Sequence, residues 1–170
     1  GDDLAGILIT AFRHDVQQAQ ELPDPAFLAK ARALCDKAGA ALICDDVRAG
    51  FRLDLRGSWA GLGILPDLSA YSKSIANGWP LAAIAGSDSM RAGAEKIFTT
   101  GSFWYGTAAM AAAVATITIL RDTDALAHTA AMGQRFRDGM DAAARAHGYS
   151  LRQTGPVQMP KWIDMKYSVT

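Results

Sequence analysis

The stretch Leu42-Ile43-Cys44-Asp45-Asp46-Val47 decides the fold class, because a short apolar run that ends in acidic residues is typical of a buried strand with a polar end. A second stretch, Ala70-Tyr71-Ser72-Lys73-Ser74-Ile75-Ala76-Asn77-Gly78, closes another predicted strand and carries a lysine there. An α/β sheet gathers its functional groups at the carboxyl ends of its strands. We therefore expect Asp45 and Lys73 to lie at the same edge of a sheet.

An amine and a carboxylate at two strand ends match the needs of pyridoxal phosphate. This cofactor requires a lysine that holds its aldehyde as a Schiff base, and an acid that keeps its pyridine nitrogen protonated so that the ring withdraws electrons. Lys73 fits the first role and Asp45 the second. Taken alone, each has a simpler interpretation, as a solvated lysine and as a strand-end aspartate that caps a loop. Together they predict a pyridoxal phosphate site.

Composition and charge favour an enzyme of the cytoplasm with small-molecule partners. The chain has 170 residues, enough for one domain core, and its 17 basic residues balance 17 acidic ones. No net field would attract nucleic acid or an acidic membrane surface. The apolar run from Ala108 to Leu120 is too short to cross a bilayer, and residues 1–4 lack the features of a signal peptide.

The sulfur and imidazole side chains give no support for a metal site. Cys35 falls on a predicted helix and Cys44 in an apolar strand, which favours buried thiols in a reducing compartment. The histidines lie far apart in the sequence, without the paired spacing of metal ligands, at His14, His128 and His147. We expect no metal.

Strand and helix patterns alternate along the chain, which predicts a three-layer α/β fold with a mostly parallel sheet. We expect strands at residues 4–10, 41–44, 67–72 and 81–86, and a strand at 149–152 that opens a smaller unit. Asp24, Pro25 and Gly39 predict the two ends of a first helix. Further helices are expected at residues 88–96, from 106 or 107 to about 120, and from a cap at Asp122 or Thr123 to about 146.

Four patches follow one another in a recognisable order: Asp45-Asp46-Val47-Arg48-Ala49-Gly50-Phe51-Arg52; Pro66-Asp67-Leu68; Ser72-Lys73 with Asn77-Gly78-Trp79-Pro80-Leu81-Ala82-Ala83; and Gly101-Ser102-Phe103-Trp104 with Ala109-Met110-Ala111-Ala112. In this order they resemble the class III pyridoxal-phosphate aminotransferases, in particular the branch similar to glutamate-1-semialdehyde aminomutase. The resemblance runs from about residue 4 to residue 120. It implies a large domain of fold type I and transfer of an amino group between an amine or amino acid and an oxo-acid or aldehyde.

The resemblance also implies roles for single residues. Lys73 becomes the Schiff-base lysine and proton shuttle, Asp45 the partner of the pyridine nitrogen, and Val47 a contact for the face of the ring. Ser102, with Phe103 beside it, stands near the position of a threonine that binds the cofactor phosphate of the neighbouring subunit. The resemblance therefore implies a homodimer with a shared active site.

Some features depart from the family pattern. Asp46 replaces a usual glutamate, Ala49 a small hydroxyl residue, and Arg48 is open to interpretation as a substrate-carboxylate ligand or as part of a surface ion pair. Family members are longer, so the chain is expected to be the middle of such an enzyme: residues 1–147 in the cofactor-binding large domain and residues 148–170 at the start of the small C-terminal domain. Two alternatives stay open, a truncated non-catalytic fragment and another pyridoxal-phosphate reaction such as an aminomutase or decarboxylase.

Overall fold

The chain forms two compact units in the computed structural model, which describes residues 3–15, 18–104 and 106–167. The first unit comprises Gly1–Ala11 and Asp24–Thr123, and the second comprises Phe12–Pro23 and Asp124–Thr170. The two units are described separately below.

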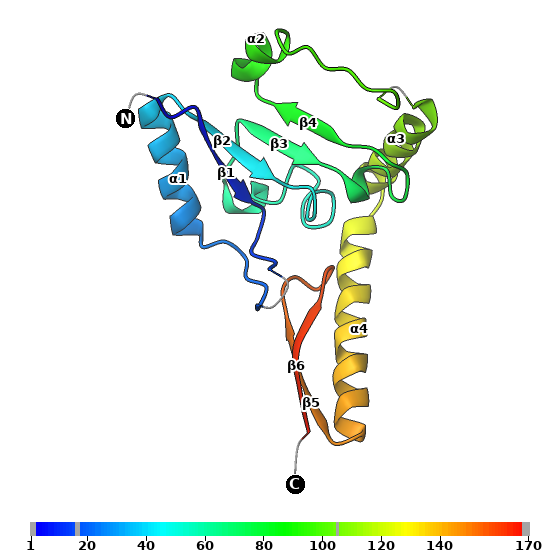
Figure 1. Cartoon of the computed structure of the whole chain (residues 1–170). Coiled ribbons are helices and arrows are strands. Elements are labelled where there is room, and N and C mark those ends of the chain that lie inside the picture. Colours follow the sequence, from blue (N-terminus) through cyan, green and yellow to red (C-terminus); the bar gives the residue numbers. More distant parts are fainter. Residues whose placement is uncertain (1–2, 16–17, 105, 168–170) are drawn as a thin grey trace. The chain divides into compact units, whose positions relative to one another are not determined.

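The first unit is built on a four-stranded sheet in the order β1-β2-β3-β4 (Figure 1). The strands are β1 (Gly6–Thr10), β2 (Ala41–Asp45), β3 (Leu68–Tyr71) and β4 (Ala83–Gly86). β1, β2 and β3 run parallel, whereas β4 pairs antiparallel with β3. The α/β fold with a mostly parallel sheet is thereby confirmed, and each of the four strands lies within about two residues of its predicted bounds.

Helix α1 (Pro25–Ala38) joins β1 to β2 and begins and ends where its capping residues predict. The Asp24 carboxylate accepts a hydrogen bond from the Ala26 N–H at 2.8 Å, and Pro25 occupies the first turn, where its missing N–H costs nothing. Gly39 ends the helix with φ of 65°, a conformation that a side chain disfavours. The helix packs against β1 and β2.

The two faces of the sheet differ strongly in burial. Leu42, Cys44 and Ser69 share one face, and each is less than 9% exposed. On the opposite face, Leu8 is 63% exposed and Ile84 is 76% exposed. The parallel register places Asp45 on this second face, because side chains alternate along a strand.

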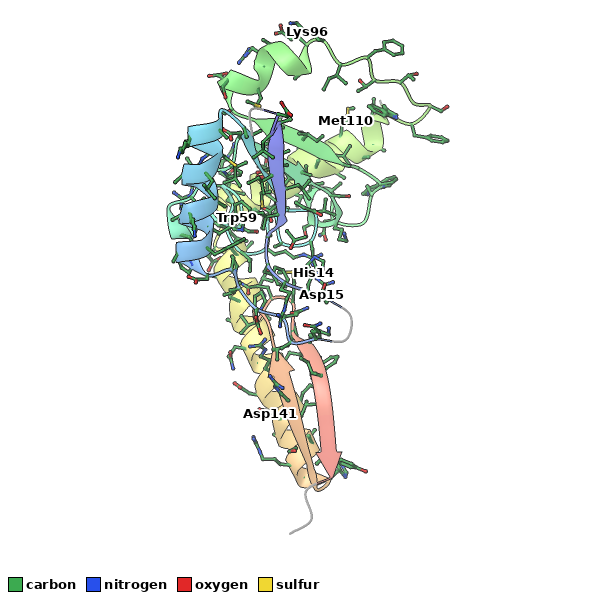
Figure 2. The ribbon with its side chains drawn as sticks, turned by 60° about the vertical axis from the view of Figure 1, so that its left-hand side comes forward. His14, Asp15, Trp59, Lys96, Met110 and Asp141 are labelled. Atoms are coloured by element: carbon green, nitrogen blue, oxygen red, sulfur yellow. The ribbon has the colours of Figure 1, made fainter. Side chains whose placement is uncertain are left out.

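The connection from β2 to β3 is fixed by a buried tryptophan. Trp59 is 1% exposed, and its indole N–H donates to the Ala11 carbonyl oxygen at 2.9 Å (Figure 2). A short 3-10 helix η1 (Ala60–Leu62) follows it. The hydrogen bond ties this connection to the end of β1, so the loop after Asp45 has a defined path.

The remaining elements of the first unit follow the lysine. The 3-10 helix η2 (Lys73–Ile75) follows β3, and the 3-10 helix η3 (Asp88–Met90) and α2 (Arg91–Ala94) follow β4. Helix α3 (Thr107–Asp122) then contacts η2, where Ile75, Ala76 and Ala113 form a buried cluster. The segment that carries Lys73 therefore lies against helix α3.

The second unit consists of a long helix beside a β-hairpin (Figure 1). Helix α4 (Ala125–Ala146) contacts β5 (Tyr149–Thr154), which pairs antiparallel with β6 (Lys161–Tyr167). The Arg137 guanidinium donates to the carbonyl oxygens of Thr154 and Gly155, at 2.9 and 2.5 Å. The predicted strand near residue 149 is confirmed, whereas the expected domain division at residues 147 and 148 stays a prediction.

The start of α4 differs from the sequence expectation. The N-cap position belongs to Asp124, not to Asp122 or Thr123, and its side chain makes no capping hydrogen bond. Asp122 is the last residue of α3, and the Thr123 hydroxyl donates back to the Ile119 carbonyl oxygen at 2.6 Å. The two residues that were expected to cap the start of α4 are therefore the last residue and the C-cap of α3.

Candidate active site

The sheet brings Asp45 and Lys73 to the carboxyl ends of two neighbouring strands. The β2–β3 register pairs Asp45 with Ala70, three residues before Lys73, and the Asp46 N–H donates to the Ala70 carbonyl oxygen at 3.0 Å. Both predicted residues therefore lie at the same edge of the sheet, as the strand pattern indicated. In an open α/β sheet this edge is where ligands bind.

Lys73 has an unusual backbone conformation. Its φ of 50° lies in the left-handed region, which costs a residue with a side chain about 1 kcal/mol or more. On one side of it, the Ser72 hydroxyl donates to the Leu81 carbonyl oxygen at 2.9 Å. The lysine is exposed and makes no hydrogen bond or ion pair with any residue that the structure describes. Its amine is thus available to a ligand.

Asp45 is half-buried and offers one carboxylate oxygen. Its Oδ1 accepts the N–H of Val47 at 3.2 Å, which closes a tight turn directly after the strand. Its Oδ2 has no hydrogen-bond partner in the described part of the chain. The half-buried Val47 follows at once, so the acid and the predicted ring contact are held by one turn.

Asp46 has a structural role that the sequence analysis did not predict, because it appeared there only as a replacement for a usual glutamate. It is 1% exposed, and its carboxylate accepts the N–H of Ser58 at 2.9 Å and the Ser58 hydroxyl at 2.5 Å. Burial raises the pKa of Asp46 above its usual value, the two Ser58 hydrogen bonds lower it, and the nearby Asp45 raises it. Asp46 therefore anchors the loop that follows Asp45.

A second loop segment also contacts the end of β3. A Cβ on Gly50 would lie 2.6 Å from the Tyr71 ring, so only glycine fits there. The next residue, Phe51, has φ of 63°, and its ring lies 5.0 Å from that of Tyr71. Arg52 then donates from Nε to the Ser74 hydroxyl at 2.5 Å. Sequence reasoning assigned no role to Phe51 or Arg52, although both stand in the quoted motif.

The predicted phosphate-binding residues are not joined to this pair within one chain. Ser102 and Phe103 precede α3 in an exposed connection, and Phe103 is 92% exposed. No hydrogen bond, ion pair or ring contact links either residue to Lys73 or Asp45 among the described residues. Their predicted role toward a neighbouring subunit stays a prediction.

The donor set at the sheet edge suits an aldehyde cofactor better than a metal. No group of three or more His, Cys, Asp or Glu residues in the described ranges could hold a metal ion. A cavity of about 620 Å³ lies between β4, η3 and α2, and neither Lys73 nor Asp45 lines it. The available amine and the carboxylate oxygen match the donor set that pyridoxal phosphate requires. Among the described residues, no helix combines the length and the apolar character that a membrane span needs.

Known proteins with similar sequences are named as aminotransferases or as an aminomutase. The family model for aminotransferase class-III matches residues 2–157. Aminopentol aminotransferase of Sphingopyxis macrogoltabida is 47% identical over 159 residues, which are 94% of this chain and 38% of that protein. Glutamate-1-semialdehyde 2,1-aminomutase of Neisseria gonorrhoeae is 34% identical over 87% of this chain and 35% of its own length.

The structural comparison gives the same result. The FumI protein of Sphingopyxis sp. MTA144, solved in its PLP internal aldimine form, matches with a TM-score of 0.89 and 46% identity, over 95% of this chain and 39% of that one. A transaminase with PLP bound matches with a TM-score of 0.80 and 26% identity, over 95% of this chain and 38% of its own. The chain thus spans about two fifths of these relatives' length.

These matches confirm the resemblance and the fold type I architecture that it implied. The family match covers all four quoted patches, from Asp45 to Ala112. The chain belongs to the class III aminotransferases, a family of pyridoxal-phosphate-dependent enzymes.

Proposed function

We propose that the protein transfers an amino group between an amine or amino acid and an oxo-acid or aldehyde, with pyridoxal phosphate as its cofactor. The observation that carries this proposal is the placement of Lys73 and Asp45 at the ends of two neighbouring strands. Family membership supports it, because aminotransferases of this family use that cofactor. A cytoplasmic enzyme without nucleic-acid or membrane partners suits the balanced charge of the chain.

Each residue at the sheet edge has a defined task in this proposal. When bound, pyridoxal phosphate supplies an aldehyde that reacts with amines and a ring that withdraws electrons. Lys73 would hold the aldehyde carbon through its Nζ, and its free amine would move a proton at the substrate α-carbon. Asp45, whose Oδ1 accepts the Val47 N–H, would accept the pyridine N–H with its Oδ2, and Val47 would pack on the ring face. The positive charge of the protonated ring would then offset the cost of the partial burial of Asp45.

We also propose that two copies of the chain share each site. Ser102 and Phe103 stand just before α3 and do not contact Lys73 in their own chain, which suits a role toward a second subunit. Phe98, Phe103 and Trp104 are 90%, 92% and 52% exposed, and a subunit interface would cover such apolar surface. Within each subunit we assign residues 1–147 to the cofactor-binding domain and residues from 148 onward to a smaller domain.

The names of the relatives suggest which amines to try first. They act on aminopentol, 3-aminobutyryl-CoA and glutamate-1-semialdehyde, according to their names. We expect an aminopentol-type amine to be the best donor, because the aminopentol enzyme shares the highest identity among these three. Pyruvate and 2-oxoglutarate are suitable acceptors for the screen, since each carries a ketone group that an amino group can replace.

The test is a covalent trap at Lys73. The full-length protein is mixed with pyridoxal phosphate, reduced with borohydride and mapped by mass spectrometry. We expect one modified lysine, Lys73, and no modified lysine anywhere in Lys73→Ala. The control is Lys96→Ala, which removes another exposed lysine of the same unit (Figure 2) and should leave the adduct intact. An unmodified wild-type protein, or an undiminished adduct in Lys73→Ala, would show that the proposal is wrong.

A further inference from the structure

Backbone strain in the described part of the chain is concentrated around the lysine. Three described residues other than glycine have left-handed backbone angles, Phe51, Lys73 and Asn77. Lys73 is the first residue of the 3-10 turn η2, and Asn77 lies two residues after its end. Phe51 packs against the cluster that contains Ile75, the last residue of this turn. Such conformations persist where the surrounding structure holds them, and they gather at functional sites. The strain indicates that the geometry of this turn is controlled from Phe51 as well as from the turn itself.

Two successive residues of the β2–β3 connection, Phe51 and Arg52, contact the segment that carries Lys73. Phe51 packs against the buried cluster that Ile75 and Ala76 of this segment form with Ala113. Arg52 donates from Nε to the hydroxyl of Ser74, the residue next to Lys73, at 2.5 Å. Phe51, the first of these two residues, has a left-handed backbone angle. One contact is apolar and one is polar, so they fix both the position and the orientation of the turn.

The polar contact is an unusual use of an arginine. Arg52 is partly buried, and burial together with the nearby Arg48 lowers its pKa. It makes no ion pair with any described acidic residue, and its partner is a neutral hydroxyl. Partial burial of a cation beside another cation is unfavourable. The stability of the fold therefore does not explain why Arg52 is placed here. We attribute the cost to a need to hold Ser74, and with it Lys73, in position.

We propose that Phe51, Arg52 and Ser74 form a latch that positions the Lys73 amine for covalent bonding to a carbonyl carbon. The latch also joins the two halves of the site, because Arg52 belongs to the loop that begins at Asp45 and Ser74 follows the lysine. Arg52 and Ser74 act through Lys73 and touch no reacting atom, so they are positioning residues. This inference rests on the function proposed above.

The experiment measures how fast Lys73 bonds to pyridoxal phosphate in the full-length protein. In this step the amine nitrogen forms a double bond to the aldehyde carbon, and the carbonyl oxygen leaves as water with the two hydrogens of the amine. Borohydride then reduces the carbon–nitrogen double bond at timed intervals, and mass spectrometry quantifies the modified Lys73. The variants are Ser74→Ala, Ser74→Thr, Arg52→Gln and the double variant Arg52→Gln/Ser74→Ala. The thermal midpoint of each variant is recorded beside the rate.

We expect Ser74→Ala and Arg52→Gln each to slow bonding at Lys73 at least about tenfold, the change that corresponds to the loss of one hydrogen bond to a charged group. Ser74→Thr keeps the hydroxyl and should restore the rate. The double variant should be no slower than the slower single variant, since both remove the same bond. The control, Arg32→Gln, removes another partly buried arginine, whose partners are Asp36 and Asp67, and should lower the thermal midpoint without a change in rate.

The outcomes separate the two proposals. A wild-type protein that forms no adduct at Lys73 would overturn the proposed function and this inference with it. A normal wild-type adduct with an unchanged rate in Ser74→Ala would overturn the latch alone. Rate losses that follow the thermal midpoint across all variants, Arg32→Gln included, would also overturn it, because they would show a general effect of stability.

Discussion

A single carboxylate, Asp67, joins the start of β3 to both β2 and α1. Its Oδ2 accepts the Leu42 N–H at 2.7 Å and the Arg32 guanidinium at 2.7 Å. The side chains of Arg32 and Asp67 are 21% and 22% exposed, so solvent screens their ion pair in part. We predict that Asp67→Asn destabilises the first unit in a way that depends on pH.

The size of the effect follows from what asparagine keeps and what it loses. Its carbonyl oxygen still accepts the Leu42 N–H, but the charge opposite Arg32 is gone. Removal of one partner from a buried ion pair costs roughly 3–5 kcal/mol, and partial exposure reduces this. We expect the free energy of unfolding at pH 7 to fall by about 2 kcal/mol. The exposed pair of Asp88 with Arg91 should contribute under about 0.5 kcal/mol, so Asp88→Asn is the matched control.

The pH dependence has a definite sign. Burial alone would raise the pKa of Asp67, but the Leu42 N–H and the Arg32 guanidinium outweigh it and hold the pKa below the usual 3.8. A group whose pKa is lower in the folded state stabilises it above its unfolded pKa, and this stability is lost as the pH falls through the folded pKa. The difference between wild type and Asp67→Asn should therefore be largest near neutral pH and shrink in acid.

Urea unfolding curves measure this difference directly. The two proteins and Asp88→Asn are unfolded from pH 7 down to the lowest pH at which the wild type still unfolds cooperatively. A difference that stays constant over this range would refute the assignment of the effect to the Asp67 charge. A loss at pH 7 no larger than that of Asp88→Asn would refute the claim that this pair stabilises the sheet.

Three further predictions concern the interior of the first unit. Trp59→Phe removes the hydrogen bond to the Ala11 carbonyl and buried volume, and should lower the free energy of unfolding by about 2 kcal/mol in urea titrations. Gly50→Ala places a Cβ 2.6 Å from the Tyr71 ring and should cost about 1–3 kcal/mol, measured in the same way; equal stability would contradict the close approach. Burial raises the pKa of the Cys44 thiol, so a thiol reagent at pH 8 should leave Cys44 unmodified until urea unfolds the protein.

Most of the fold could be predicted because its signals are local. Asp24, Pro25 and Gly39 set the ends of α1 through their own backbone preferences, whatever the rest of the chain does. The predicted start of α4 was wrong, because Asp124 takes the N-cap position. The Thr123 hydroxyl donates to an acceptor in the preceding helix, the Ile119 carbonyl oxygen. Propensity alone does not show which of two helices a capping side chain joins.

The site could be predicted only to the level of strand ends. The alternation of buried residues continues from Leu42 through Cys44 to Asp46, so the period of two could have revealed that Asp46 points inward. The bond between Arg52 and Ser74 joins segments 22 residues apart, and a residue with a left-handed angle, Phe51 or Lys73, stands directly before each of its two partners. Neither pattern nor composition carries that information, because such angles are imposed by tertiary contacts.

The antiparallel return of β4 has a consequence for how such a site can change during evolution. Tyr71 pairs with Ala83, and the Ser72 hydroxyl binds the Leu81 carbonyl, so both ends of the lysine loop are fastened to the sheet. The tip of that loop, Trp79 and Pro80, is exposed, and Trp79 is 54% exposed. Substitutions at the tip therefore need not move the Lys73 amine. New side chains can be sampled there while the residue that performs the chemistry keeps its place.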